Sequence, residues 1–182
     1  MRFRCPEGYF NPLATLLFNT EGGTIRTLLD FPSQLKNNQS DSSVPVGDIS
    51  IYLVVWYSLT IVTYGVWVPA GLFLPGILIG CAVGILYMDI LVYGFDANLD
   101  NIGGQSYIII GATAMLAGYC RLTYSLAVIM LETTQSINNF LPTLLAIAVS
   151  LGVSKACNRS LYDYAIRTKQ MPLLRNHMPA AN

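Results

Sequence analysis

The sequence predicts an all-α membrane protein with multiple tilted, interrupted transmembrane helices. Of its 182 residues, 53% are hydrophobic and only 11% are charged, whereas soluble domains carry roughly 25% charged residues. Long apolar runs, and prolines and glycines that interrupt them, point to the same class. We expect residues 1–48 to form short helices and a polar luminal-side loop, residues 49–170 the transmembrane region, and residues 171–182 a cytoplasmic tail.

The N-terminal part is expected to form two short helices at the membrane edge or packed on other helices. The pair Asn11-Pro12 is typical of a helix start, and Glu21-Gly22-Gly23 is typical of a helix break. A polar run rich in Ser and Asn follows over residues 32–48 and predicts a loop. Asp48 at its end would cap the next helix.

Two apolar runs then predict two long helices. Residues 49–68 contain no charged side chain, and about 20 such residues suffice to cross a bilayer. In the second run, 71–93, Gly76, Gly80 and Gly84 recur at every fourth position. This spacing lets a neighbouring helix approach closely. We interpret the glycines mainly as packing residues, and a direct functional part is the alternative.

The remaining apolar segments are shorter or interrupted. Residues 106–132 are broken near Arg121, so they predict two helices that are each shorter than a full crossing. Residues 141–157 predict one further helix. Ser160 would cap a last amphipathic helix that runs from residue 161 to about residue 169.

The placement of charge indicates the orientation of the chain and excludes several functions. Past residue 152 the basic residues outnumber a single acid, Asp163, so the positive-inside rule puts the C-terminus in the cytoplasm. A net charge of zero without a basic tract argues against nucleic-acid binding. The lone His177, the scattered cysteines and the lack of a close carboxylate pair in the membrane region argue against an enzyme, a metal site or a cofactor.

The strongest functional signal is the stretch from Pro69 to Pro75, which lies between the two long apolar runs. Its prolines and glycine would interrupt the helix at mid-membrane depth. Irregular backbone is tolerated there only where it is buried or lines a cavity. A helix that begins at such a point directs its free N–H groups and the positive end of its dipole into that cavity. The natural occupant is an anion.

The string Gly71-Leu72-Phe73-Leu74-Pro75 resembles the Gly-x-Phe-x-Pro motif of the CLC family of chloride channels and chloride/proton exchangers. Further segments resemble the family in the same order, namely residues 111–118 with 121–125, 128–134 and 160–163. Residues 5–11 are similar to the start of this region in eukaryotic intracellular and plant members. The resemblance covers about residues 5–174 and implies the second half of the CLC membrane fold.

This resemblance implies an anion-binding site. The backbone N–H groups of Leu72 and Phe73 and the hydroxyl of Tyr162 would bind the anion, and Gly71 and Pro75 would form the motif that shapes the turn. Neutral donors suit conduction, because an ion must be held weakly enough to leave. In the alternative interpretations Phe73 is a packing residue and Tyr162 an interfacial anchor.

The implied function is transmembrane chloride or other anion transport, as a voltage-gated channel or a chloride/proton antiporter, with chloride as transported ligand and no cofactor. The family's gating-glutamate motifs do not occur in this sequence, so we expect a C-terminal fragment; channel or exchanger, and chloride or nitrate, are both open. The alternative is a non-transporting membrane fragment that packs with or modulates a full-length CLC subunit. The expected partners are a small anion, membrane lipid and a second copy, joined through helices near residues 122–132 and 141–157. The expected location is an endosomal, lysosomal or vacuolar membrane, which the chain crosses several times.

Overall fold

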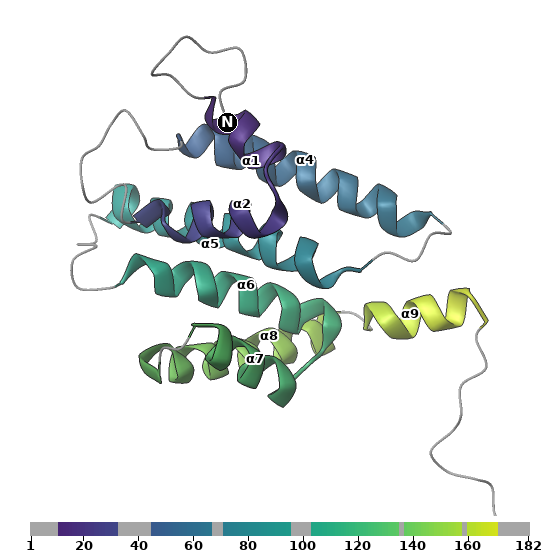
Figure 1. Cartoon of the computed structure of the whole chain (residues 1–182). Coiled ribbons are helices and arrows are strands. Elements are labelled where there is room, and N and C mark those ends of the chain that lie inside the picture. Colours follow the sequence, from purple (N-terminus) through teal and green to yellow (C-terminus); the bar gives the residue numbers. More distant parts are fainter. Residues whose placement is uncertain are drawn as a thin grey trace, which may run out of the picture.

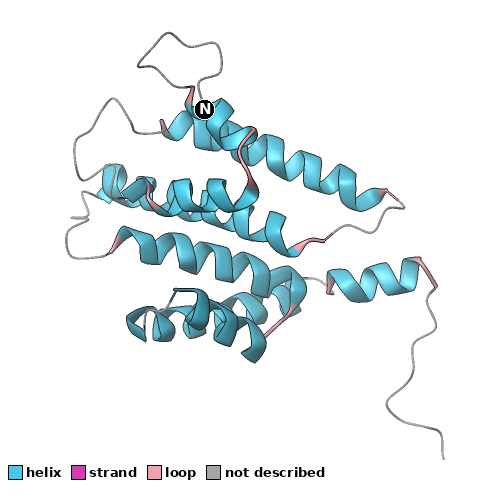
Figure 2. Cartoon of the chain, in the orientation of Figure 1, coloured by secondary structure: helices cyan, strands magenta, loops and turns pink. Residues whose placement is uncertain are grey.

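The computed structural model describes residues 11–32, 45–66, 71–95, 103–134, 137–157 and 160–170. Every regular element in these ranges is a helix (Figure 2), which confirms the predicted all-α class. The elements are α1 (Pro12–Leu17), α2 (Glu21–Leu29), α4 (Val46–Gly65), α5 (Phe73–Phe95), α6 (Gly104–Cys120), α7 (Tyr124–Thr134), the short 3-10 helix η2 (Ile137–Asn139), α8 (Phe140–Cys157) and α9 (Leu161–Thr168).

The helices are stacked in layers (Figure 1). α5 packs between α4 and α6, and α6 packs in turn against α8, with α7 beside α8 on the same side. Successive helices α4, α5 and α6 run in opposite directions, and α2 lies along α5. α9 extends away from the end of α6. The start of α5 and the end of α6 therefore lie at the same end of the stack, where α9 begins.

Three helical stretches in the described ranges are long and apolar enough to cross a membrane: Val46–Tyr64, Phe73–Val92 and Ile137–Cys157. Half of the residues in the middle stretch are buried inside the protein (50%), against 11% in each of the other two. α5 is therefore the central helix. α4 and α8 leave apolar faces uncovered, which is the arrangement expected of helices that contact lipid.

The glycines of α5 bring α6 close, as their spacing predicted. A Cβ added at Gly80 would lie 2.5 Å from Cα of Ala112, and one at Gly84 would lie 2.8 Å from the carbonyl oxygen of Tyr107. Both neighbours are backbone atoms of α6, so only glycine permits this separation. Gly76, one turn earlier, faces a side chain of α6 rather than its backbone.

Two expectations about helix ends were wrong. Asp48 is not the cap of α4, because the helix begins earlier: Pro45 is the N-cap residue and Asp48 lies in the first turn. There its carboxylate still interacts favourably with the positive end of the helix dipole. Gly22 and Gly23 do not break a helix but lie inside α2. The side chain of Thr20 accepts a hydrogen bond from Gly23 N–H, and this cap offsets the cost of glycine in a helix, about 1 kcal/mol.

The interruption expected near Arg121 is confirmed. α6 ends at Cys120, Arg121 adopts a left-handed backbone with φ of 56°, and α7 begins at Tyr124. Ser160 is the N-cap residue of α9, as predicted, although its side chain makes no capping hydrogen bond. The expectations for a luminal-side loop and a cytoplasmic tail fall largely on residues 33–44 and 171–182, outside the described residues.

Candidate anion site at the start of α5

α5 begins inside the Gly-x-Phe-x-Pro motif. The carbonyl of Leu72 accepts a hydrogen bond from Gly76 N–H at 3.1 Å, which closes the first turn. The N–H groups of Leu72, Phe73 and Leu74 lie ahead of that bond and have no acceptor within the helix. Pro75 has no N–H at all. The donors available at this helix end are therefore backbone groups of residues 72 to 74, with no charged side chain in the motif.

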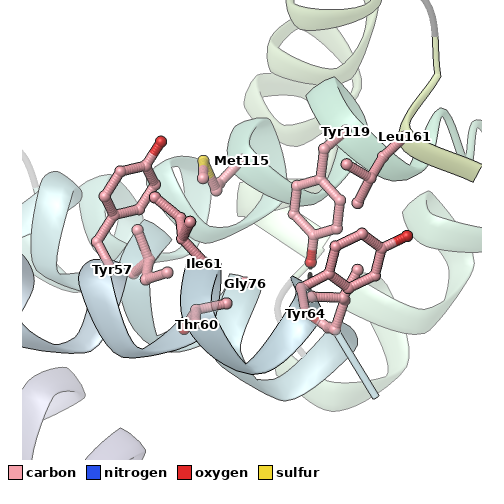
Figure 3. Close-up of a pocket in the computed structure, with 10 residues that line it drawn as sticks. Tyr57, Thr60, Ile61, Tyr64, Gly76, Met115, Tyr119 and Leu161 are labelled. Atoms are coloured by element: carbon pink, nitrogen blue, oxygen red, sulfur yellow. Dashed lines mark hydrogen bonds between the residues drawn. The ribbon is translucent and has the colours of Figure 1, made fainter. Parts of the chain in front are cut away.

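This helix start lies at the wall of a cavity of about 330 Å³. Four separate segments form the wall (Figure 3): α4, the residues that open α5, the last part of α6 and the first residue of α9. The lining residues are Tyr57, Thr60, Ile61, Tyr64, Leu72, Gly76, Ile79, Met115, Tyr119 and Leu161.

The described lining of this cavity carries no charged side chain. Its side-chain polar groups are hydroxyls, contributed by Tyr57, Thr60, Tyr64 and Tyr119. The hydroxyls of Thr60 and Tyr119 already donate to the carbonyls of Trp56 and Leu72, which leaves those of Tyr57 and Tyr64. An apolar wall with a few neutral donors can replace part of the hydration of an anion without trapping it.

A second cavity, of about 340 Å³, is lined by other residues of the motif, including Gly71 and Pro75, and shares Thr60, Tyr64 and Leu72 with the first. Glu21 of α2 also lines this second cavity. A carboxylate repels an anion at short range. The first cavity, which has no charged lining residue, is therefore the better candidate for the anion-binding cavity.

Tyr119 makes a contact with the motif that the sequence analysis missed. Its hydroxyl donates a hydrogen bond to the carbonyl of Leu72 at 2.7 Å, across 47 positions in the sequence. Gly76 provides the space, because a Cβ there would overlap the Tyr119 hydroxyl. The signal that could have suggested this pair is a tyrosine on the last turn of a helix predicted to pack on the glycine row.

The predicted site residues fall into two groups. Gly71, Leu72, Phe73 and Pro75 share one turn at the start of α5. Tyr162 is on α9, next to the cavity-lining Leu161; it is 46% exposed, and its hydroxyl lies 3.8 Å from Sγ of Cys120. Leu72 lines both cavities, and Gly71 and Pro75 line the second. Phe73 and Tyr162 lie beside the cavities and are not among the lining residues of either. The role of Tyr162 as an anion donor stays a prediction.

Residues 8–155 match the family model described as "Voltage gated chloride channel". The chain belongs to this family. The family resemblance seen in the sequence is therefore confirmed, and the helical fold described above is a membrane fold of the voltage gated chloride channel family.

Individual relatives agree with the family assignment. The chain is 33% identical over 177 residues to Chloride channel protein CLC-c of Arabidopsis thaliana, covering 96% of this chain and 21% of that protein. It is 37% identical over 168 residues to CLC-d of the same plant, covering 92% and 20%. It is 32% identical over 178 residues to H(+)/Cl(-) exchange transporter 7 of Bos taurus, covering 98% and 21%. The chain thus spans about a fifth of the length of the curated relatives it matches.

Proposed function

We propose that this chain forms one wall of a transmembrane anion pathway, with chloride as the transported ligand and without a cofactor or a chemical reaction. The observation that carries this proposal is the start of α5 at Phe73, because the turn that holds its first N–H groups contributes Leu72 and Gly76 to the wall of an uncharged cavity. Several relatives are named as chloride channels and one as a H(+)/Cl(-) exchange transporter. Their names support anion transport and are compatible with both a channel and an antiporter.

In this proposal the anion accepts hydrogen bonds from the backbone N–H groups of Leu72 and Phe73 and from the hydroxyl of Tyr162. The positive end of the α5 dipole adds a favourable electrostatic contribution. Tyr162 is a neighbour of the cavity, because it follows the lining residue Leu161 and its hydroxyl lies 3.8 Å from Sγ of Cys120, the residue after the lining Tyr119. Gly71 and Pro75 set the shape of the turn.

Chloride titration calorimetry on the chain in lipid nanodiscs tests this site. A Cβ at Gly71 meets no atom within 4 Å, so G71F should fold normally while its ring obstructs the turn and abolishes the chloride heat. G47F is the matched control, because Gly47 is equally open and lies in the first turn of α4, outside the motif. Equal chloride affinity in G71F and the wild type would contradict the proposed site.

A second candidate function is that of a non-transporting membrane subunit, which packs with or modulates a full-length CLC protein. A row of exposed apolar side chains on α8 favours it: Leu141, Leu145, Val149 and Val153 are 58% to 66% exposed. The row follows one helix face at intervals of four residues and fits either lipid or another helix. The same face would serve the homodimer expected through residues 122–132 and 141–157.

Chloride efflux from liposomes that contain only this chain separates the two candidates. Efflux above that of empty liposomes would show that the chain transports by itself and would contradict the non-transporting subunit. Without efflux, transport that appears on addition of the N-terminal part of a relative's membrane domain would support the pathway-wall proposal.

The protein is an integral membrane protein of several helices, and we propose that its C-terminus faces the cytoplasm. The basic residues past position 152 support this orientation. We further propose an endosomal, lysosomal or vacuolar membrane, on the basis of the similarity of residues 5–11 to the intracellular and plant members. Fluorescent tagging of the C-terminus, combined with selective permeabilisation of the plasma membrane, tests both statements.

A further inference from the structure

We propose that Tyr119 is a positioning residue, which orients the Leu72–Phe73 peptide unit so that its N–H faces the anion. This inference rests on the proposed function, because it assigns a role at the same site. It begins with the 2.7 Å hydrogen bond from the Tyr119 hydroxyl to the carbonyl of Leu72. No part of the motif string indicates this contact, since Tyr119 belongs to the last turn of α6.

The geometry of one peptide unit connects Tyr119 to the proposed anion donor. The carbonyl of Leu72 and the N–H of Phe73 belong to the same planar group, in which they point in opposite directions. A donor that holds the carbonyl therefore fixes the direction of the N–H. The hydrogen bond also polarises the peptide unit, which makes its N–H a stronger donor.

Two bonds hold this carbonyl. Gly76 N–H donates to it along the helix at 3.1 Å, and Tyr119 donates to it from α6. The first bond is a normal part of any helix start, whereas the second ties the turn to a neighbouring helix. A backbone turn beside a cavity can rotate its peptide groups, and the hydroxyl of Tyr119 limits that rotation.

Gly76 makes this contact possible. A Cβ on Gly76 would overlap the hydroxyl of Tyr119 and come within 2.7 Å of its Cζ. Gly80 and Gly84 differ, because their open faces admit the backbone of α6. The first glycine of the row therefore accommodates the tyrosine ring, and the other two set the distance between the helices.

Selective isotope labelling isolates the peptide unit concerned. The sequence contains two Leu-Phe pairs, Leu17-Phe18 and Leu72-Phe73. Labelling leucine with 13C at the carbonyl and phenylalanine with 15N therefore gives two correlated NMR signals from the whole chain in lipid nanodiscs. Phe18 serves as an internal reference, because its N–H is already bonded to the carbonyl of Ala14 at 3.0 Å.

The key variant is Y119F, which removes the hydroxyl and keeps the ring. In chloride-free buffer the Leu72 carbonyl carbon should move to lower chemical shift, as a carbonyl does when it loses a hydrogen bond. The chloride concentration that half-saturates the shift of the Phe73 amide should rise roughly three- to tenfold, the loss expected from one neutral hydrogen bond. Y107F is the matched control, because Tyr107 lies on the same helix as Tyr119 but does not line the cavity.

A second variant tests the same contact from the other side. G76A should displace the hydroxyl and shift the Leu72 carbonyl in the same direction. Because both changes remove one bond, the double variant should show the carbonyl shift of Y119F alone. Additive shifts would contradict a common cause.

The possible results separate the inference from the function on which it rests. A Leu72 carbonyl that stays unmoved in Y119F, or a chloride response equal to the wild type, overturns the role of Tyr119. If the wild-type Phe73 amide signal does not change with chloride, the anion site is wrong. The role of Tyr119 at that site is then wrong as well, even if the carbonyl shift confirms the hydrogen bond. Movement of both signals in Y119F, with neither changed in Y107F, supports the inference.

Discussion

At the scale of single residues, glycine has three different uses around the start of α5. Gly71 lies in open space at the turn, Gly76 makes room for a tyrosine ring, and Gly80 makes room for the backbone of α6. These environments predict different responses to the same substitution. A side chain at Gly71 would meet solvent or a ligand. One at Gly76 would meet the movable hydroxyl of Tyr119, and one at Gly80 would meet the fixed backbone of α6.

We predict that G80A destabilises the protein by about 1–3 kcal/mol, the typical cost of overpacking a well-packed contact. The added methyl group would lie 2.5 Å from Cα of Ala112, so the two helices must separate. The control is G152A on α8, where a Cβ meets nothing within 4 Å. Unfolding by SDS in mixed micelles, monitored by circular dichroism, measures the free energy of unfolding of both variants. Equal stability of the two variants would argue against the close contact.

The sequence predicted the residues at the start of α5 better than the residue of α6 that contacts them. Leu72 and Phe73 follow from a local motif, because prolines and a glycine interrupt a helix, and the first N–H groups of the helix that starts after them have no acceptor within it. Tyr119 could not be paired with Leu72 in this way, since 47 positions separate them and only the packing of α5 on α6 brings them together.

At the scale of helices, hydroxyl groups tie α6 to α8. Ser150 donates to the carbonyl of Ala114 at 2.6 Å, and Ser154 donates to the carbonyl of Gly118 at 2.5 Å. The two serines are four residues apart, on one face of α8. The guanidinium of Arg121 also donates to the carbonyl of Ser154, at 3.4 Å. Small polar residues thus link two helices where hydrophobic burial contributes little within a lipid environment.

We predict that the double variant S150A/S154A lowers stability by about 1 kcal/mol, since each interhelical hydrogen bond in a membrane contributes roughly 0.6 kcal/mol. The matched control is S58A on α4, because that hydroxyl donates to Val54 within its own helix. The same SDS unfolding assay measures the difference. If S58A cost as much as the double variant, the stabilisation would not come from the contact between α6 and α8.

Apolar runs predicted the helices well and their ends less well. The run 49–68 became α4, which is displaced toward the N-terminus as Val46–Gly65. The proline at position 45 explains the early start, because its fixed φ suits the N-terminal boundary of a helix. Hydropathy reports where a helix can cross a membrane, whereas caps and prolines decide where its hydrogen bonds begin.

At the scale of the whole molecule, α5 is half buried between its neighbours, and the outer helices α4 and α8 are much less covered. α4 exposes apolar side chains such as Val54 and Val62, and α8 exposes Leu145 and Val149. Lipid can cover both faces, but a second copy of the chain is expected only on the side of α7 and α8. The two faces therefore provide a comparison within one protein.

We predict that L145C forms a disulfide-linked dimer in membranes under oxidising conditions, in a background whose native cysteines are replaced by alanine. V54C, on the opposite side of the stack and similarly exposed (61% against 60%), should stay monomeric. Non-reducing electrophoresis of the membrane fraction distinguishes the two. Dimers from V54C and none from L145C would place the interface elsewhere.

The central claim is that backbone N–H groups at the start of α5 bind a halide. The most direct measurement is the 15N–1H signal of Phe73 in the labelled wild-type chain, recorded while chloride replaces gluconate at constant ionic strength. We predict a saturable shift of the Phe73 amide, while the Phe18 amide, already bonded within α1, stays in place. A Phe73 amide that does not move, or that moves in parallel with Phe18, would contradict the account.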